Sequence, residues 1–200
     1  IDFANLEGSK FDNMLGLGSG AAVIFGNSGG VTEAAVRTAY HTITGQDPTS
    51  ELLKFEPVRG LDGVKEASIT IGDFTLNIAV VQGTANARTL IEKIKNNEVN
   101  YDFVEVMACK GGCIGGGGQP KTTKVINDKI RTSRIDSLYE KDVELKIKCS
   151  YQNPDIIAVY DEFYKKTLSH VAHELLHTSY SSKKHMLGLD SEEQTSEATI

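Results

Sequence analysis

One glycine-rich stretch, EVMACKGGCIGGGGQP from Glu105 to Pro120, carries two of the three cysteines of the chain and six of its 19 glycines. Cys109 and Cys113 can direct their sulfurs at one centre only if the backbone between them turns tightly. Gly111 and Gly112 permit the positive φ values that such a turn needs. Glycine also lets main-chain N–H groups approach the sulfides of a cluster, which tunes its reduction potential. The pattern therefore predicts a tight loop that holds a metal or a redox centre.

The residues before the loop, DFVEVMA from Asp102 to Ala108, predict a short buried strand. The cysteines would then follow the carboxyl end of a strand, where open α/β sheets bind ligands. Reduced and inert thiols in a glycine turn are the alternative, and the spacing alone leaves it open. A cubane iron–sulfur cluster needs four thiolates, and Cys149 is the only other cysteine, so the chain is at least one ligand short.

A strand, a helix and a second strand are predicted to lead into the loop. Alternating β-formers predict strands from Val64 to Ile71 and from Phe74 to Val81, joined by a hairpin turn at Gly72 and Asp73. The helix after Gly83 is predicted to reach Lys95 and to turn Ala87, Leu90, Ile91 and Ile94 inward, and Phe55 to Arg59 is read as a further β-rich segment. The predicted class is α/β, with a mixed β-sheet flanked by helices and a helical C-terminal segment.

Upstream, the apolar run from Ala21 to Phe25 predicts a strand, followed by the turn GNSGG and a helix from Val31 to Thr44 with Gly45 as its C-cap. Apolar residues recur every four positions along that helix, at Val31, Ala35, Ala39 and Ile43, with Val36 and Tyr40 beside them. A helix N-terminus after glycines also suggests a phosphate site. The sequence GLGSGA matches the dinucleotide fingerprint poorly and lacks its acidic partner, which argues against a nucleotide.

Downstream of Pro120 the patterns are helical. One helix is predicted from Val125 to Tyr139, with Ile126, Ile130, Ile135 and Leu138 inward and Arg131 and Arg134 outward. Further helices are expected from Pro154 to Tyr164 and from Leu168 to about Thr178. The first 18 residues read as a loop, and residues 181–200 as a flexible polar tail.

Composition narrows the class of protein. The 200 residues are 40% hydrophobic, enough for a globular domain with a core, and the net charge of −6 argues against nucleic acid and anionic membranes as partners. No apolar run of membrane-spanning length and no secretory leader occurs in the sequence. An odd cysteine count suits a reducing compartment better than a disulfide scaffold.

A second metal motif competes with the loop. His173, Glu174 and His177 form a complete H-E-x-x-H, in which two histidines one helical turn apart bind zinc and the glutamate activates water. A catalytic zinc site needs a third protein ligand. The next histidine, His185, is misplaced for that role, and only a polar tail follows. A zinc peptidase is therefore the weaker interpretation.

Three segments resemble motifs of the iron-only hydrogenases. EVMACKGGCIGGGGQP is similar to the last cysteine motif of that family, E-V-M-A-C-P-G-G-C-x-x-G-G-G-Q-P, with Lys110 where proline is usual. SGAAVIFGNSGGVTEAAVRTAY, from Ser19 to Tyr40, is similar to S-G-A-x-x-I-F-G-x-T-G-G-V-M-E-A-A-L-R-T. SYQNPDIIAVYDEF and AHELLHTSY resemble the C-terminal segment of the family, which also carries the H-E-x-x-H as a structural element.

The resemblance covers Ile1 to Tyr180 and implies a partial domain. Two earlier motifs of the family, T-S-C-C-P and M-P-C-x-x-K, supply two cluster cysteines, a proton-delivering cysteine and a lysine near the iron, and neither occurs here. The chain thus looks like the C-terminal half of the active-site domain, either cut from a longer protein or acting as a subunit. Residues 1–120 would form an α/β lobe, residues 121–180 a helical wrap, and residues 181–200 the tail.

The resemblance also implies a function and a site. Members of the family reversibly reduce protons to H2 at an H-cluster, a 4Fe-4S cluster joined to a diiron subcluster. By resemblance Cys109 ligates the cubane, Cys113 bridges it to the diiron subcluster, and Met107 and Phe25 line the diiron pocket, whereas Cys149 is read as incidental. The implied partners are the missing N-terminal half and a ferredoxin-type electron carrier, in the cytoplasm or a hydrogenosome-like reducing compartment of an anaerobe.

Two alternatives to a hydrogenase remain open. The first is a hydrogenase-related protein that binds or senses iron–sulfur clusters without turnover. The second is the zinc peptidase suggested by His173 and His177. For Phe25, an ordinary core phenylalanine is the alternative to a wall of the cofactor pocket.

Overall fold

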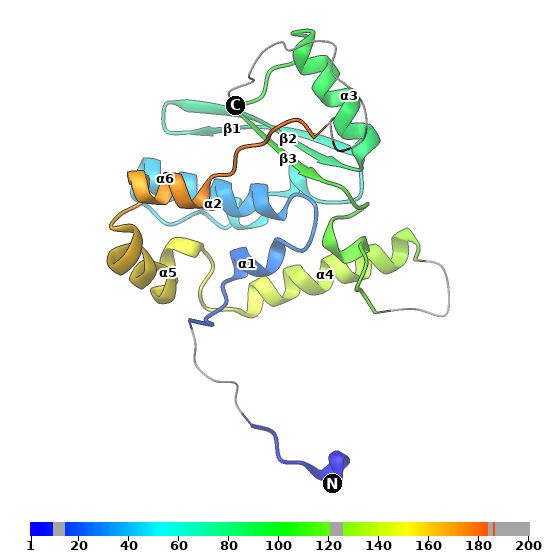
Figure 1. Ribbon diagram of the computed structural model, residues 1–200, viewed down its shortest axis with the longest axis vertical. Coiled ribbons are helices and arrows are strands. Elements are labelled where there is room, and N and C mark those ends of the chain that lie inside the picture. The colour runs from blue at the N-terminus through cyan, green and yellow to red at the C-terminus, as the bar shows by residue number, and fades with distance from the viewer. Residues whose placement is uncertain (10–14, 121–125, 184–185, 187–200) are drawn as a thin grey trace. The chain divides into compact units, whose positions relative to one another are not determined.

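A computed structural model describes residues 1–9, 15–120, 126–183 and 186. The chain divides into two compact units, Ile1–Ala158 and Val159–Ile200. In the first unit the principal elements are α1 (Gly20–Ile24), α2 (Gly30–Thr44), β1 (Val64–Ile71), β2 (Phe74–Gln82), α3 (Thr84–Lys95), β3 (Phe103–Met107) and α4 (Asp128–Glu144) (Figure 1). Helix α5 (Pro154–Val159) lies at the boundary. The second unit contains a π-helical turn (Tyr160–Tyr164) and α6 (His170–Leu176).

The sheet is mixed and has the order β1-β2-β3. β1 and β2 form the predicted antiparallel hairpin, in which Ile71 pairs with Phe74 and Gly72 adopts a positive φ of 59°. β2 and β3 are parallel, with Gln82 opposite Met107, and α3 forms the crossover between them. The predicted strand, helix and strand are therefore confirmed, and so is the α/β class. The expectation that the strand before the cysteines is buried is wrong, because β3 ends the sheet and only its Glu105 is buried.

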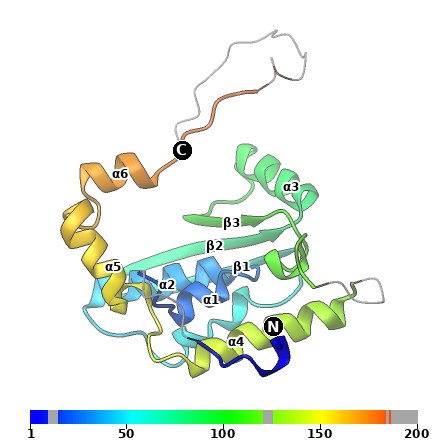
Figure 2. The same cartoon turned by 60° about the horizontal axis from the view of Figure 1, so that its bottom comes forward.

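The second half of β2, from Ile78 to Gln82, is buried on both faces, which explains its apolar run from Ile78 to Val81. Ala79 and Val81 pack under α3, against Ala87 and Leu90. The alternate residues of β2, Ile78 and Val80, face the other way and pack with Val36 of α2 and with Phe55 and Val58. The sheet thus lies between α3 on one face and α2 on the other (Figure 2). Ile91 and Ile94 were expected in the core but stay partly exposed, because the core under α3 takes up only its Ala87 and Leu90 side.

The predicted strand over residues 21–25 is wrong, because these residues form α1. Ser19 caps the helix, and its hydroxyl accepts a hydrogen bond from the Ala22 amide at 3.2 Å. The amides of Gly20 and Ala21 donate to the carbonyls of Ile147 and Lys148 instead of to a strand. A short apolar run fits a buried helix turn as well as a strand. The hydrogen bonds that favour the helix come from Ile147 and Lys148, which are distant in the sequence.

The β-rich reading of residues 55–59 is also wrong. This segment forms short 3-10 helices, Leu52–Lys54 and Glu56–Val58, with Pro57 in the second. Proline has no backbone N–H to donate to a neighbouring strand, and its ring fixes φ near the helical value. Phe55 and Val58 are nevertheless buried in the core, where they pack with Ile78 and Val80 of β2.

Helix α2 confirms the predicted helix with its left-handed Gly45 cap, but it buries an unexpected side. The buried side includes Val36 and two charged residues, Glu33 and Arg37. Arg37 donates to Glu33 at 2.8 Å and to Asp142 of α4 at 2.7 Å, so the buried charges are paired. The residues of the predicted apolar stripe, Val31, Ala35, Ala39 and Ile43, are half-buried or exposed.

The helical predictions after Pro120 are confirmed with shifted bounds. α4 begins at Asp128 and continues to Glu144, and the helix predicted from Pro154 comprises α5 and the π-helical turn. The helix predicted from Leu168 is shorter and spans His170–Leu176. Val125 and most of the predicted tail, residues 184–185 and 187–200, lie outside the described residues. Across the described part of the chain, no helix has the length and apolar character that a bilayer crossing requires.

Candidate metal centre

The cysteine loop starts directly at the end of β3, as predicted. Gly111 and Gly112 both adopt positive φ, at 82° and 89°, which confirms the tight turn between the two cysteines. The Gly112 amide donates to the Cys109 carbonyl at 3.0 Å, and a 3-10 turn, Cys113–Gly115, follows at once. Both cysteine side chains are exposed. The loop therefore presents two free thiols from one compact turn.

Close approach requires glycine at position 112 of the loop, and Gly116 lies against both cysteines. A Cβ on Gly112 would lie 2.6 Å from the Ser28 amide nitrogen and 2.9 Å from the Met107 sulfur. A Cβ on Gly116 would lie 3.3 Å from the Cys109 sulfur and 3.4 Å from the Cys113 carbonyl oxygen. Gly116 thus sits beside both cysteines, and its missing side chain keeps the space at the Cys109 sulfur open.

The loop is joined to the turn that follows Phe25. The Ser28 amide donates to the Gly111 carbonyl and the Ile114 amide to the Gly26 carbonyl, both at 3.0 Å. These bonds bring the segment of Phe25 beside the segment of Cys113. Phe25 is 45% exposed. Met107 is half-buried. The structure thus gathers all four predicted site residues, Phe25, Met107, Cys109 and Cys113, in adjoining segments.

Glu105 is a functional candidate that the sequence reading missed. Its carboxylate is 6% exposed and accepts hydrogen bonds from the amides of Gly29, at 2.6 Å, and Thr32, at 2.8 Å, and from the Thr32 hydroxyl, at 2.7 Å. An internal carboxylate therefore occupies the N-terminus of α2, the place that a phosphate would take. Glu105 ties the strand before the cysteines to the turn after Phe25. A charged residue in an otherwise apolar strand is the signal that could have identified it.

Lys65 lies beneath the same turn. Its ammonium donates to the carbonyls of Ser28 at 3.0 Å and Gly60 at 3.1 Å, and the residue is 6% exposed. Burial lowers the pKa of Lys65 to about 8, and the nearby carboxylates of Glu105 and Asp62 oppose that fall. Gln82, at the end of β2, also supports the loop, because its amide oxygen accepts from Gly111 and its nitrogen donates to Asp62 at 2.6 Å.

The outer side of the loop is held by α4. Arg134 donates to the carbonyls of Ile114 at 2.7 Å and Pro120 at 2.9 Å, so the expectation that Arg131 and Arg134 point outward is wrong. Both arginines are half-buried, because a long side chain can reach carbonyls beside the helix that carries it. Lys110, which departs from the family motif, pairs with Asp128 at 2.7 Å. That hydrogen bond from Lys110 keeps the pKa of Asp128 below its usual range.

Cys149 differs from the loop cysteines in its surroundings. It is 1% exposed and lies before the 3-10 turn Ser150–Gln152, where its amide donates to the Gln152 side chain. Burial raises the pKa of its thiol, so the thiolate that binds a metal is disfavoured. Among the described residues, no group of three or more Cys, His, Asp or Glu side chains is placed to hold a metal. The loop thus offers two ligands of a cluster that needs four, and fits half of such a site.

The H-E-x-x-H motif lies in the second unit. The rings of His173 and His177 are 4.2 Å apart, and His170 is 3.8 Å from the Glu174 carboxylate. His177 already has extended backbone angles, φ −98° and ψ 143°, since α6 ends at Leu176. His185, the next histidine after the motif, lies outside the described residues.

We expect His173→Ala to leave the metal content of the protein unchanged. The variant should lose no more than about 0.5 kcal/mol of unfolding free energy, because no described third ligand makes the histidine pair a closed site. Elemental analysis after purification in zinc-containing buffer checks this, with His170→Ala as the matched control. Loss of one equivalent of zinc in His173→Ala alone would restore the peptidase interpretation.

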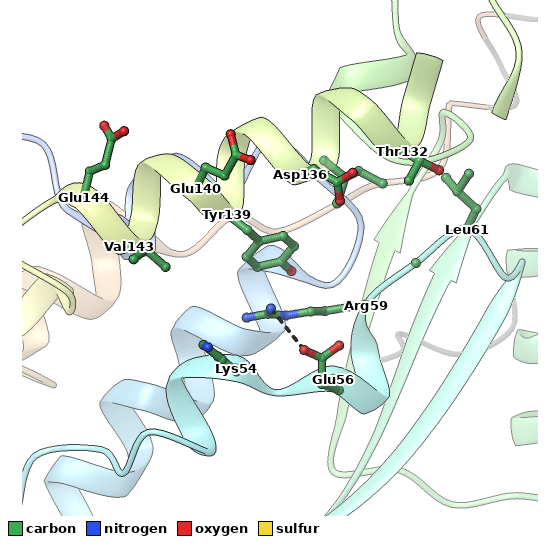
Figure 3. A pocket seen from close by; sticks show the side chains of 12 residues that line it. Lys54, Glu56, Arg59, Leu61, Thr132, Asp136, Tyr139, Glu140, Val143 and Glu144 are labelled. Atoms are coloured by element: carbon green, nitrogen blue, oxygen red, sulfur yellow. Dashed lines mark hydrogen bonds and ion pairs between the residues drawn. The ribbon is translucent and has the colours of Figure 1, made fainter. Parts of the chain in front are cut away.

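A pocket of about 940 Å³ lies between α4 and the segment of residues 54–61, away from the cysteines (Figure 3). Three of its charged lining residues, Glu56, Arg59 and Glu144, form ion pairs within the protein. The Arg59 guanidinium stacks 3.7 Å from the centre of the Tyr139 ring and donates to Glu33 at 2.6 Å. No cysteine lines the pocket. Although it is large, it therefore does not belong to the metal centre.

Comparisons with known proteins agree with this geometry. Residues 1–117 match the family described as "Iron only hydrogenase large subunit, C-terminal domain", and residues 128–183 match the "Iron hydrogenase small subunit". The chain is 45% identical over 186 residues to the NADP-reducing hydrogenase subunit HndD of Solidesulfovibrio fructosivorans, covering 93% of this chain and 31% of that protein. It is 30% identical over 184 residues to protein NAR1 of Arabidopsis thaliana, covering 90% of this chain and 38% of that protein.

The fold has a solved counterpart in a variant of the FeFe-hydrogenase HydA1 from Chlamydomonas reinhardtii. The two share 40% identity with a TM-score of 0.64 over 90% of this chain and 51% of that one. The chain thus spans about half of that hydrogenase and about a third of the two relatives. Because the family match covers more than half of the chain, the chain belongs to the family of the iron-only hydrogenase large subunit, C-terminal domain.

Proposed function

We propose that this chain supplies two cysteine ligands to an H-cluster for the reversible reduction of protons to H2. Cys109 would ligate the 4Fe-4S cluster, and Cys113 would bridge it to the diiron subcluster. The single observation that carries the proposal is the compact loop with two exposed thiols and a glycine, Gly116, beside them. The family match and the 45% identity to a hydrogenase subunit support it.

The roles of the protein are ligation, shape and exclusion of water. When bound, the cluster would supply the electrons and the open iron position that the reaction needs. Phe25 and Met107 would form apolar walls beside the cysteines, and the soft thioether of Met107 suits a contact with a polarisable metal centre. Glu105 and Lys65 would act as positioning residues, because each fixes the turn that carries Phe25.

The proposed partners follow from what the chain lacks. The remaining half of the active-site domain, in cis or as another subunit, would supply the other cluster ligands, and a ferredoxin-type carrier would deliver electrons. The net charge of −6 argues against nucleic acid and anionic membranes as partners. We further propose that it works in a reducing compartment, where Cys109 and Cys113 remain free thiols.

A second candidate function is a cluster-binding protein without hydrogenase turnover. The relatives favour it, since they include protein NAR1 and a probable cytosolic Fe-S cluster assembly factor of Drosophila willistoni, which is 36% identical over 155 residues. In this candidate the loop would hold a cubane through Cys109 and Cys113, and Phe25 would line no catalytic pocket. Hydrogen evolution by the completed domain distinguishes the two.

The isolated chain should not assemble an intact cluster. Anaerobic reconstitution with iron and sulfide should give fewer than about four irons per chain and no cubane EPR signal, because only two thiolates are clustered. The same chain joined to the preceding half of the Chlamydomonas hydrogenase active-site domain should bind a cubane. A full cubane on the isolated chain, or none on the joined protein, would contradict the proposal.

A further inference from the structure

A buried hydroxyl without a hydrogen-bond partner lies next to the cysteine loop. Among the described residues, three buried side-chain nitrogen or oxygen atoms have no such partner, namely the Ser28 Oγ, the Arg37 Nε and the Arg131 Nε. Ser28 is only 1% exposed. A buried polar atom without a partner costs stability, and nearly all such atoms in folded proteins are paired. The unused hydroxyl of Ser28 therefore requires an explanation.

The other polar groups of Ser28 are all used within the chain. Its amide donates to the Gly111 carbonyl at 3.0 Å, and its carbonyl accepts from the Lys65 ammonium, also at 3.0 Å. The next residue, Gly29, is held by the Glu105 carboxylate at 2.6 Å. Ser28 is thus fixed on both sides by hydrogen bonds, and its hydroxyl alone is left without a partner.

Two of the three unpartnered atoms belong to residues that adjoin the cysteine loop. A Cβ on Gly112 would lie 2.6 Å from the Ser28 nitrogen, and a Cβ on Gly115 would lie 3.3 Å from the Arg131 Nε. Both unpartnered groups can donate a hydrogen bond. The third atom, the Arg37 Nε, belongs to the buried ion pairs of α2. Unused donors therefore occur beside the segment that carries the two exposed thiols.

The sulfur atoms of an iron–sulfur cluster accept hydrogen bonds, and these bonds help to set its reduction potential. We infer that the Ser28 hydroxyl donates a hydrogen bond to a sulfur of the cluster on Cys109 and Cys113 and thereby raises the reduction potential of that cluster. The reduced cluster carries more negative charge, so it accepts the bond more strongly than the oxidised cluster does. The inference rests on the proposed function for the presence of the cluster.

Two buried serines provide the test. Ser28→Ala and Ser19→Ala are prepared in the chain joined to the preceding half of the Chlamydomonas hydrogenase active-site domain, and the cubane is reconstituted with iron and sulfide. In Ser28→Ala the ratio of reduced to oxidised cubane at a fixed solution potential, followed by EPR, should fall about tenfold, or about 59 mV for one electron. Ser19 is the matched control, because it is 3% exposed and its hydroxyl already caps α1. Ser19→Ala should keep the ratio within about twofold.

Two further measurements separate a bond to the cluster from a structural role. In the isolated chain without iron, Ser28→Ala should not lower Tm, because no hydrogen bond is lost. Ser19→Ala should lower Tm by about 2–4 °C, because it removes the helix cap. Proton ENDOR spectra of the reduced cubane in H2O and D2O should show an exchangeable coupling that Ser28→Ala lacks and Ser19→Ala retains.

The contrary outcomes are distinct. An unchanged ratio in Ser28→Ala, in a joined protein that binds a cubane, would overturn the inference while the proposed function stands. A fall in the Tm of the isolated Ser28→Ala chain as large as that of Ser19→Ala would also overturn the inference, because the hydroxyl would then have a partner in the absence of the cluster. A joined protein without the substitutions that binds no cubane would overturn the proposed function, and the inference with it.

Discussion

Cys113→Ser should abolish hydrogen evolution by the completed domain. In the proposed site Cys113 is the only covalent link between the cubane and the diiron subcluster, so its loss removes an attachment that no other described residue can replace. A serine alkoxide is far harder to form than a thiolate and suits soft, low-valent iron poorly. The backbone should tolerate the change, since the side chain is exposed and the turn depends on Gly111 and Gly112.

The matched control is Cys149→Ser. The Cys149 thiol is buried and protonated, and it lies in no cluster of metal ligands among the described residues, so activity per folded molecule should stay within about twofold of wild type. Hydrogen evolution from a chemical reductant is measured with the joined protein and the mature diiron cofactor. Near-normal activity in Cys113→Ser would show that the bridging role is misassigned. Complete loss in Cys149→Ser, with the fold intact by circular dichroism, would show the same for Cys149.

The parts of the fold that the sequence predicted well are set by local chemistry. The hairpin at Gly72 has alternating strands and a turn residue that accepts positive φ, and α3 has a clear amphipathic period. The cysteine loop was predictable for the same reason, because two consecutive glycines between cysteines require an unusual backbone. In each case the residues that decide the structure are neighbours in the sequence.

The errors occur where distant residues decide. Five apolar residues at positions 21–25 fit either a strand or a helix, and the choice depends on the carbonyls of Ile147 and Lys148. Along α2, the periodicity identified an apolar side but not which part of the structure covers it. Arg134 was placed in solvent because its carbonyl partners come from the loop and not from its own helix.

Glu105 shows a different limit of the sequence. It lies in the motif that identified the site, yet a single glutamate in a strand resembles a solvent-facing residue. The structure turns it inward, because the N-terminus of α2 offers it two amides and a hydroxyl at 2.6–2.8 Å. The predicted ligands could be found from residue type. The sequence could mark Glu105 as unusual for an apolar strand, but only the topology shows that it joins their two segments.

Glu105→Ala should therefore cost about 3–5 kcal/mol of unfolding free energy at neutral pH. The substitution leaves two amides and the Thr32 hydroxyl without their acceptor. It also removes a carboxylate whose charge stabilises the buried ammonium of Lys65. Chemical denaturation of the isolated chain measures the loss. Glu92→Ala, on the exposed side of α3, is the matched control and should change stability by less than about 0.5 kcal/mol.

The pH dependence of the unfolding free energy separates two effects of Glu105→Ala, the effect on the charge of Lys65 and the loss of the hydrogen bonds of Glu105. Lys65 has a pKa of about 8 in the folded chain, below its ordinary value of 10.5, so its charge destabilises the fold at low pH and stability rises once it deprotonates. Without Glu105 the pKa of Lys65 in the folded chain falls further, so the stability begins to rise at a lower pH. The cost of Glu105→Ala should then be smaller at pH 9 than at pH 6, and in Lys65→Met it should not depend on pH over that range. If Glu105→Ala lowers the unfolding free energy equally at pH 6 and pH 9 in the chain that retains Lys65, Glu105 acts only through Gly29 and Thr32.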